Sequence, residues 1–242
     1  MPYLSRIWLN PQRTKAQLIL RNPQVAHAAV LAGISRQPVS ERVLWRLEPD
    51  PVTQHRLSLL VLTDSHPSWE HLVEQAGWPH ADEPQAITRP YEPLLNQIAH
   101  GRQFTFRLKA NPTSSTKTPD SPSPTQKERL TQHRPRGVRV PHRTVAHQLA
   151  WFTSRIDRWG FTLVDGEAGL PAVRVSGRER LSFNKSSDRA APVVLQTATF
   201  EGALTVTDPD TARQSLLHGV GHGKAYGLGL ITLAPTISAA HT

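Results

Sequence analysis

The residues with the clearest chemical potential lie near the end of the chain, in a glycine-rich stretch. Residues 219–235 read GVGHGKAYGLGLITLAP, where five glycines surround His222 and Lys224. Glycines allow positive φ angles and close approach of the backbone to a ligand, so the amides and Lys224 could hold a phosphate. A tight connection from a helix to a strand also needs glycines, for its geometry alone. Both interpretations of the stretch are open at this point.

The known nucleotide-binding loops do not fit this stretch. A Walker A loop would need glycine in place of His218, and a serine or threonine in place of Ala225 after Lys224. A dinucleotide-binding loop would need a third glycine at Lys224 and a helix after it, whereas LGLITLA predicts a strand. The sequence therefore argues against an NTPase and against a dehydrogenase.

Histidine is the side chain best suited to proton transfer near neutral pH, because its ordinary pKa is about 6.5. His27 is one candidate, although its alanine and valine neighbours in NPQVAHAAV are equally typical of a structural histidine. Two histidine pairs, His218 with His222 and His142 with His147, have spacings that could suit a metal, but no cluster of carboxylates accompanies them. A metal-dependent nuclease is therefore the weakest of the alternatives.

The bulk composition narrows the choice of partner. Lys and Arg outnumber Asp and Glu by 28 to 19, which gives a formal charge of +9. This excess of positive charge favours a polyanionic partner, with nucleic acid preferred over a membrane surface.

The chain has no cysteine, which excludes disulfides, thiolate nucleophiles and cysteine-based zinc sites. The N-terminus lacks the features of a signal peptide and no apolar run could span a bilayer, so we expect a cytoplasmic protein with no membrane partner.

The first half of the chain must position these groups, and its pattern predicts a ferredoxin-like order of strands and helices. Alternating or apolar runs predict strands at 3–9, 43–49, 56–64 and 103–112, and helices are predicted at 22–33 and 67–77. The order is β-α-β-β-α-β, within a domain of residues 1–111. On the last strand, Arg107 and Lys109 point away from the apolar residues, because side chains alternate along a strand. These two cations could face RNA or simply face solvent.

The second half is predicted to be another module of helices and strands. Residues 112–137 are rich in Pro, Ser and Thr and predict a linker or mobile loop, whose basic residues could contact phosphates. Residues 138–242 form the second predicted domain. A helix is expected at 143–160, strands follow it, and a last helix at 208–219 leads into the glycine-rich stretch and a terminal strand.

The sequence resembles the CasE family, the CRISPR-repeat-processing endoribonucleases of type I-E Cascade complexes, within the RAMP superfamily. The resemblance covers nearly the whole chain except the Pro/Ser-rich segment and the region 166–191. It is carried by MPYLSRIWLNP, NPQVAHAAVL, WRLEP and FRLKANP, and above all by TATFEGALTVTDPDTARQSLLHGVGHGKAYGLGLITLAP. The resemblance implies an α+β fold of two tandem ferredoxin-like, or RRM-like, domains.

The resemblance also implies an activity. Members of the family cut precursor CRISPR RNA at the base of each repeat hairpin without a metal or other cofactor. A 2′-hydroxyl attacks the adjacent phosphorus and leaves a cyclic phosphate and a 5′-hydroxyl. The enzyme then keeps the mature guide RNA and joins the other Cascade subunits. The alternative is a protein of the same fold that binds the repeat hairpin without cutting it.

The family's site residues transfer to this chain one by one. The catalytic histidine matches His27, and Gln24 stands where some relatives have a tyrosine that this chain lacks. Lys185 is the candidate for a cation at the scissile phosphate, with Arg178, Arg180 and Arg189 as competitors for that role. Further predicted RNA contacts are Arg107, Lys109, Arg174, Arg178, Arg180, Arg189, His222, Gly223 and Lys224. No metal-binding residue is implied.

Overall fold

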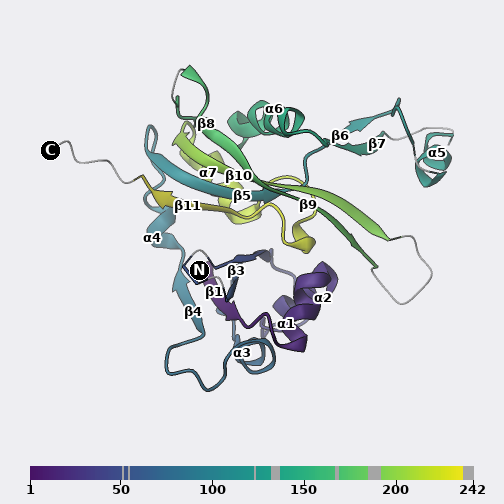
Figure 1. Ribbon diagram of the computed structural model, residues 1–242. Coiled ribbons are helices and arrows are strands. Elements are labelled where there is room, and N and C mark those ends of the chain that lie inside the picture. The colour runs from purple at the N-terminus through teal and green to yellow at the C-terminus, as the bar shows by residue number, and fades with distance from the viewer. Residues whose placement is uncertain are drawn as a thin grey trace.

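The computed structural model describes residues 1–50, 52–53, 55–122, 124–131, 137–166, 169–184 and 192–236 (Figure 1). Two large antiparallel sheets, each covered by helices on one face, pack against one another. Both sheets have the strand order of the ferredoxin-like fold, so the prediction of an α+β protein with two such units is confirmed.

The first unit contains β1 (Tyr3–Leu9), α1 (Thr14–Arg21), α2 (Pro23–Leu31), β2 (Leu44–Pro49), β3 (Leu57–Thr63), α3 (Glu70–Ala76) and β4 (Ala86–Pro90). Its strands lie in the order β2-β3-β1-β4. Alternation along the strands gives the sheet two apolar faces. One carries Ile7, Leu9 and Val61 and packs with the helices, whereas the other carries Leu44, Leu60 and Leu62 and packs on the second unit.

The second unit contains β5 (Gln103–Ala110), α6 (Val145–Ile156), η1 (Asp157–Trp159), β8 (Phe161–Leu163), β9 (Val173–Phe183), β10 (Val193–Val206), α7 (Pro209–His218), η3 (Lys224–Tyr226) and β11 (Ile231–Pro235). The order is β11-β5-β10-β8, and β9 pairs with the other end of β10. The long β9–β10 hairpin reaches beyond the sheet towards the first unit (Figure 1). A short helix, α4 (Glu92–Leu95), joins the two units.

One strand does not belong where the sequence predicts it. Residues 103–112 were expected to close the first sheet, but β5 pairs with β10 and β11 of the second sheet, and β4 takes its place. This expectation is wrong because alternation shows that a segment is a strand but does not show its partner. The short, exposed Ala86–Pro90 lacks the strong apolar pattern that β5 has. The first sheet thus ends at Pro90, and the second begins at Gln103.

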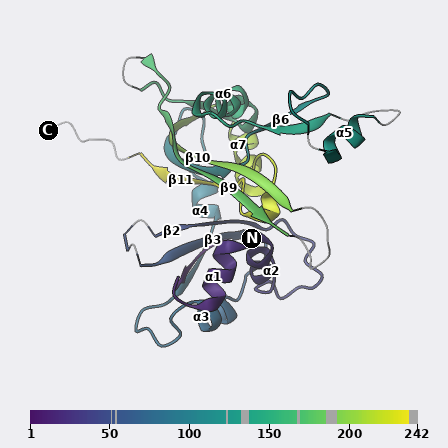
Figure 2. The ribbon, with the colours of Figure 1, turned by 45° about the vertical axis from the view of Figure 1, so that its right-hand side comes forward.

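The Pro/Ser-rich segment is also placed differently from the prediction. It contains β6 (Thr113–Thr116) and α5 (Pro124–Leu130), and β6 pairs with β7 (Val138–Pro141). These elements lie between β5 and α6, so the segment is an insertion within the second unit instead of a linker between two domains. The insertion projects away from both sheets in Figures 1 and 2. Its strands β6 and β7 satisfy each other's backbone hydrogen bonds, and the Trp151 side chain of α6 donates to the Thr113 carbonyl at 3.1 Å.

A buried arginine joins the two units. Arg46 of β2 is only 2% exposed. Its guanidinium donates to the carbonyls of Arg107 and Leu230 at 3.1 and 3.0 Å and to Thr232 Oγ1 at 2.8 Å, all in the second unit. It also donates to Glu48 of its own strand at 2.9 Å. Because a buried charge is costly unless its donors are satisfied, this geometry fixes one sheet against the other.

Replacing Arg46 should therefore weaken the whole fold. We expect Arg46→Met to lower the free energy of unfolding by about 3 kcal/mol, since the carbonyls and Glu48 lose a buried partner. Urea unfolding followed by tryptophan fluorescence measures the change. Arg6→Met, at an exposed site on strand β1 of the same sheet, is the matched control and should stay within about 0.5 kcal/mol of the parent protein. Equal unfolding curves for the two variants would contradict this role of Arg46.

Candidate nucleic-acid interface

Helix α2 positions the predicted catalytic histidine. The Asn22 side chain accepts a hydrogen bond from the backbone N–H of Gln24 at 2.9 Å, and Pro23 takes the first helical position, as the sequence predicts. Ala26 and Val30 bury the helix on the first sheet. His27 is half-buried, one turn after the half-buried Gln24.

The environment of His27 suits it to accept a proton. Its Nδ1 atom is buried and has no hydrogen-bond partner among the residues that the structure describes. Burial lowers the pKa of His27 below the ordinary histidine value, because desolvation disfavours the charged ring. The imidazole is therefore neutral near pH 7, the form that a general base needs.

The glycine-rich stretch lies against the same helix. Its one-turn helix η3 contacts both α2 and β2, and Figures 1 and 2 both show this yellow turn beside the purple α2. Gly227, with a φ of 75°, packs on the indole ring of Trp45, and a Cβ atom there would come within 2.6 Å of the ring. Tyr226 packs edge-on against Phe183 at the end of β9, with ring centroids 4.9 Å apart. The glycines thus serve close packing between the units, and they bring the turn of Lys224 against the helix that carries His27.

Positive charges gather along this turn. Lys224 is half-buried, and its pKa is lowered by burial and by the nearby charge of Arg42. Partial burial and the charges of Arg139, Lys224 and Arg155 lower the pKa of His222. These cations come from separate segments of the chain, so the sequence alone does not show that they lie together.

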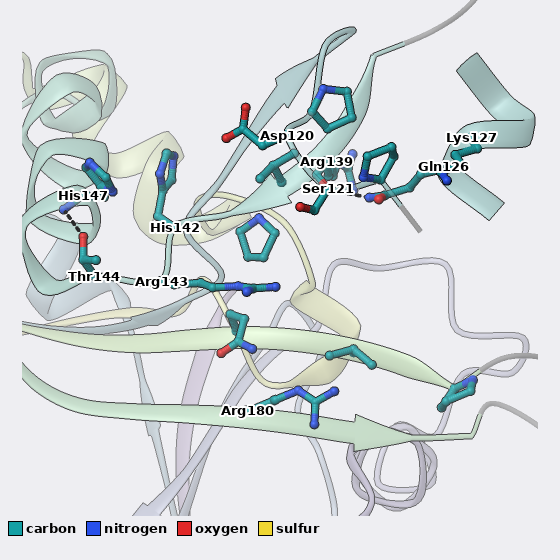
Figure 3. Close-up of a pocket in the computed structure, with 17 residues that line it drawn as sticks. Asp120, Ser121, Gln126, Lys127, Arg139, His142, Arg143, Thr144, His147 and Arg180 are labelled. Atoms are coloured by element: carbon teal, nitrogen blue, oxygen red, sulfur yellow. Dashed lines mark hydrogen bonds between the residues drawn. The ribbon is translucent and has the colours of Figure 1, made fainter. Parts of the chain in front are cut away.

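The cations continue into a groove of about 1510 Å³, shown in Figure 3. The insertion forms one wall, the start of α6 forms another, and the β9–β10 hairpin forms the floor. His142, Arg143 and His147 lie on one side, Arg139 and Lys127 on the opposite side, and Arg180 lies on the strand beneath them. Asp120 is the one acidic residue among the lining residues that the structure describes. A groove with this charge suits a nucleic-acid backbone.

The basic residues of β9 do not form the single patch that the sequence suggests. Arg174 is paired with Glu201 of β10, whereas Arg178 is opposite Ala198 and Arg180 is opposite Gln196. The register shifts at Ser176, so Arg174 points to the opposite face of the hairpin from Arg178 and Arg180. The Arg178 side chain donates to the Arg143 carbonyl at the groove. Counting every second residue fails across such a bulge.

Several predicted RNA contacts are neutralised by carboxylates. Arg107 donates to Glu201 at 2.6 Å and pairs with Glu48 at 3.3 Å, and Arg174 donates to Glu201 at 2.8 Å. Lys109 donates to Glu179 at 2.8 Å. These cations lie on the sheet face turned away from the groove, so a role in RNA binding stays a prediction for them. Lys185 and Arg189 lie outside the described residues.

The groove contains cations to which the sequence assigns no individual role in RNA binding. These are Lys127, Arg139 and Arg143, together with the pair His142 and His147, which the sequence offers only as metal ligands. Arg42 and Arg155 lie near Lys224 and His222 instead. The one signal in the sequence was the excess of basic residues in and after the Pro/Ser-rich segment. That excess did not show which residues face a common space, because the fold brings the insertion beside α6 and β9.

The histidine pairs show no metal site. In the part of the chain that the structure describes, no three His, Asp or Glu residues lie together as metal ligands would. His218 Nδ1 is 3.1 Å from the Gln214 carbonyl, and the ring centroids of His142 and His147 are 6.1 Å apart.

Among the residues that the structure describes, no helix is long and apolar enough to cross a membrane.

Comparison with known proteins decides the family. A family model described as CRISPR associated protein matches residues 2–235. The CRISPR-associated endoribonuclease Cse3 of Thermus thermophilus is 34% identical, over 96% of this chain and 100% of its own. The chain belongs to the CasE family. The CRISPR system Cascade subunit CasE of Escherichia coli is 25% identical, over 79% of this chain and 88% of its own.

A solved relative of this CasE-family protein agrees in fold. Thermus thermophilus Cse3, bound to an RNA representing a pre-cleavage complex, superposes with a TM-score of 0.73 at 33% identity. The match covers 97% of this chain and 99% of that one. The fold that places α2 beside the glycine-rich stretch is thus similar over nearly the whole chain to that of this relative.

The packing of Gly227 on Trp45 can be tested by adding one methyl group. We expect Gly227→Ala to lower the free energy of unfolding of the CasE-family protein by about 2 to 4 kcal/mol, from backbone strain together with the clash on the ring. Gly101→Ala is the matched control, because Gly101 has a φ of 77° and nothing within 4 Å of its added Cβ. That control should cost only about 1 kcal/mol. Similar losses in urea unfolding would show that the contact with Trp45 is unimportant.

Proposed function

We propose that this CasE-family protein is a metal-independent endoribonuclease that cuts precursor CRISPR RNA at the base of the repeat hairpin. It then keeps the mature guide RNA and joins the other Cascade subunits in the cytoplasm. The names of the relatives, an endoribonuclease and a Cascade subunit, support the substrate and the assembly. The observation that carries the proposal is the contact between α2, the helix of His27, and the turn of Lys224, whose neighbouring cations lead into the basic groove.

The chemical step needs only groups that RNA and this chain possess. His27 takes the proton of the 2′-hydroxyl, whose oxygen forms a bond to the adjacent phosphorus. The bond from phosphorus to the 5′-oxygen breaks, and that oxygen takes a proton from water. The products are a 2′,3′-cyclic phosphate and a 5′-hydroxyl. The lowered pKa of His27 supports this role, because a base must be unprotonated when the substrate arrives. Gln24 can donate or accept a hydrogen bond there but cannot exchange a proton.

The groove supplies the binding energy for the hairpin stem. A-form RNA is recognised mainly through its shape and phosphates, which suits a wide basic groove with cations on its walls and floor. Arg180 on the floor and Arg143 on the α6 wall can each reach a phosphate strand that enters the groove (Figure 3). The RNA strand that leaves the groove then passes His222 before it meets Lys224 and α2.

The alternative function is hairpin binding without cleavage, and Gln24 favours it because the position lacks an ionisable side chain. Repeat RNA incubated with the protein in excess EDTA distinguishes the two. We expect cleavage at one site with a cyclic phosphate and a 5′-hydroxyl as the new ends. RNA with a 2′-deoxy nucleotide at that site should bind but stay intact. His27→Ala should bind repeat RNA normally and cut it at least about 100-fold more slowly.

Two results of that assay would count against the enzyme. Unchanged cleavage by His27→Ala would remove the proposed base. Complete inhibition by EDTA that a divalent ion reverses would point to the metal-dependent alternative.

The salt dependence of RNA binding shows which face of the β9–β10 hairpin contacts the RNA. Arg180→Gln should weaken binding of repeat RNA roughly tenfold and reduce the slope of log Kd against log salt by about 0.9, as expected for one lost phosphate contact. Arg174→Gln removes the same charge from the same strand, but its guanidinium is held by Glu201 on the opposite face. We expect less than about a twofold change there. The reverse ranking of the two variants would place the RNA on the other face.

A further inference from the structure

The turn that carries Lys224 is held in place on several sides. Gly223 and Gly227, with φ angles of 87° and 75°, frame the single turn of η3. Gly227 packs on Trp45 of β2, Tyr226 packs on Phe183 of β9, and the turn itself lies against α2. Lys224 thus starts from a fixed backbone beside the helix that carries His27.

Lys224 also has no counter-ion. Among the residues that the structure describes, no carboxylate forms an ion pair with it. Its charged neighbours are Arg42 and His222, which repel it when protonated. Lys109, by contrast, is neutralised by Glu179 at 2.8 Å. A half-buried cation among other cations is stabilised only when an anion arrives, and an RNA phosphate is the anion that the neighbouring groove delivers.

We propose that Lys224 is a catalytic residue whose ammonium group binds the non-bridging oxygens of the scissile phosphate, opposite His27, with Arg42 as a second cation beside it. This inference rests on the proposed function and names a group that the function leaves open. Lys224 transfers no proton. The 2′-hydroxyl proton goes to His27, the new bond joins the 2′-oxygen to phosphorus, and the departing 5′-oxygen is protonated by water.

The charge of Lys224 acts where negative charge grows during the reaction. The pentacovalent transition state carries more charge on the non-bridging oxygens than the starting phosphodiester does. A fixed cation beside those oxygens therefore stabilises the transition state more than the ground state. The loss of Lys224 should appear in the rate of the chemical step, whereas the loss of a groove arginine should appear in affinity.

Single-turnover cleavage of repeat RNA, at protein concentrations that saturate the RNA, separates these effects. We expect Lys224→Met to slow cleavage at least about 100-fold while the Kd for uncleavable 2′-deoxy RNA changes less than about threefold. Lys224→Arg should restore a large part of the rate, because it restores the charge. The acid limb of the pH–rate profile should stay in place, since it belongs to His27. Lys15→Met, on helix α1, is the charge-matched control and should cut at the parent rate.

The proposal is overturned if Lys224→Met cuts within about threefold of the parent at saturation. It is also overturned if the loss of rate is matched by an equal loss of affinity, or if Lys224→Arg is as slow as Lys224→Met. Lys185→Met tests the competing cation: a large loss of rate there, with Lys224→Met unaffected, would assign the phosphate to Lys185. A parent protein that does not cut repeat RNA at all would instead contradict the proposed function.

Discussion

The structure depends on a buried arginine on one sheet that satisfies backbone carbonyls of the other unit. Arg46 reaches from β2 to carbonyls on β5 and beside β11, and its partner Glu48 also binds Arg107. These donors and acceptors fit at one relative position of the two units. His27 belongs to the first unit, whereas Lys224 and the groove belong to the second. The position of His27 relative to these cations is therefore set by the contacts of Arg46 between the two units.

The positive charge of the chain has two different uses. Between the sheets, Arg46, Arg107 and Arg174 form ion pairs with Glu48 and Glu201. These cations are therefore paired within the protein. Around the insertion and the glycine-rich stretch, the cations have few acidic neighbours. The excess charge of the whole chain indicates a polyanionic partner, but only the pairing of individual side chains shows where that partner can bind.

Features that depend on neighbouring residues in the sequence, such as helix capping and strand alternation, are predicted correctly. Asn22 and Pro23 mark the start of α2 through capping, and alternation identifies β5 as a strand with a polar and an apolar face. Strands that pair in a sheet can lie far apart in the sequence, so the sequence assigns β5 to the wrong sheet. The bulge at Ser176 is equally invisible in the sequence, and it separates Arg174 from Arg180. His27 came from family resemblance, because its own neighbours do not distinguish a base from a structural residue.

The contact between Gly227 and Trp45 means that substitutions at these two positions depend on each other. The two residues lie far apart in the chain and in different units, yet the ring leaves no space for a side chain at 227. A side chain at 227 meets both the backbone strain of a φ of 75° and the clash with the ring, and a smaller residue at 45 relieves only the clash. Hybrids that join the first unit of one relative to the second unit of another will therefore work only when both parents share the same pair.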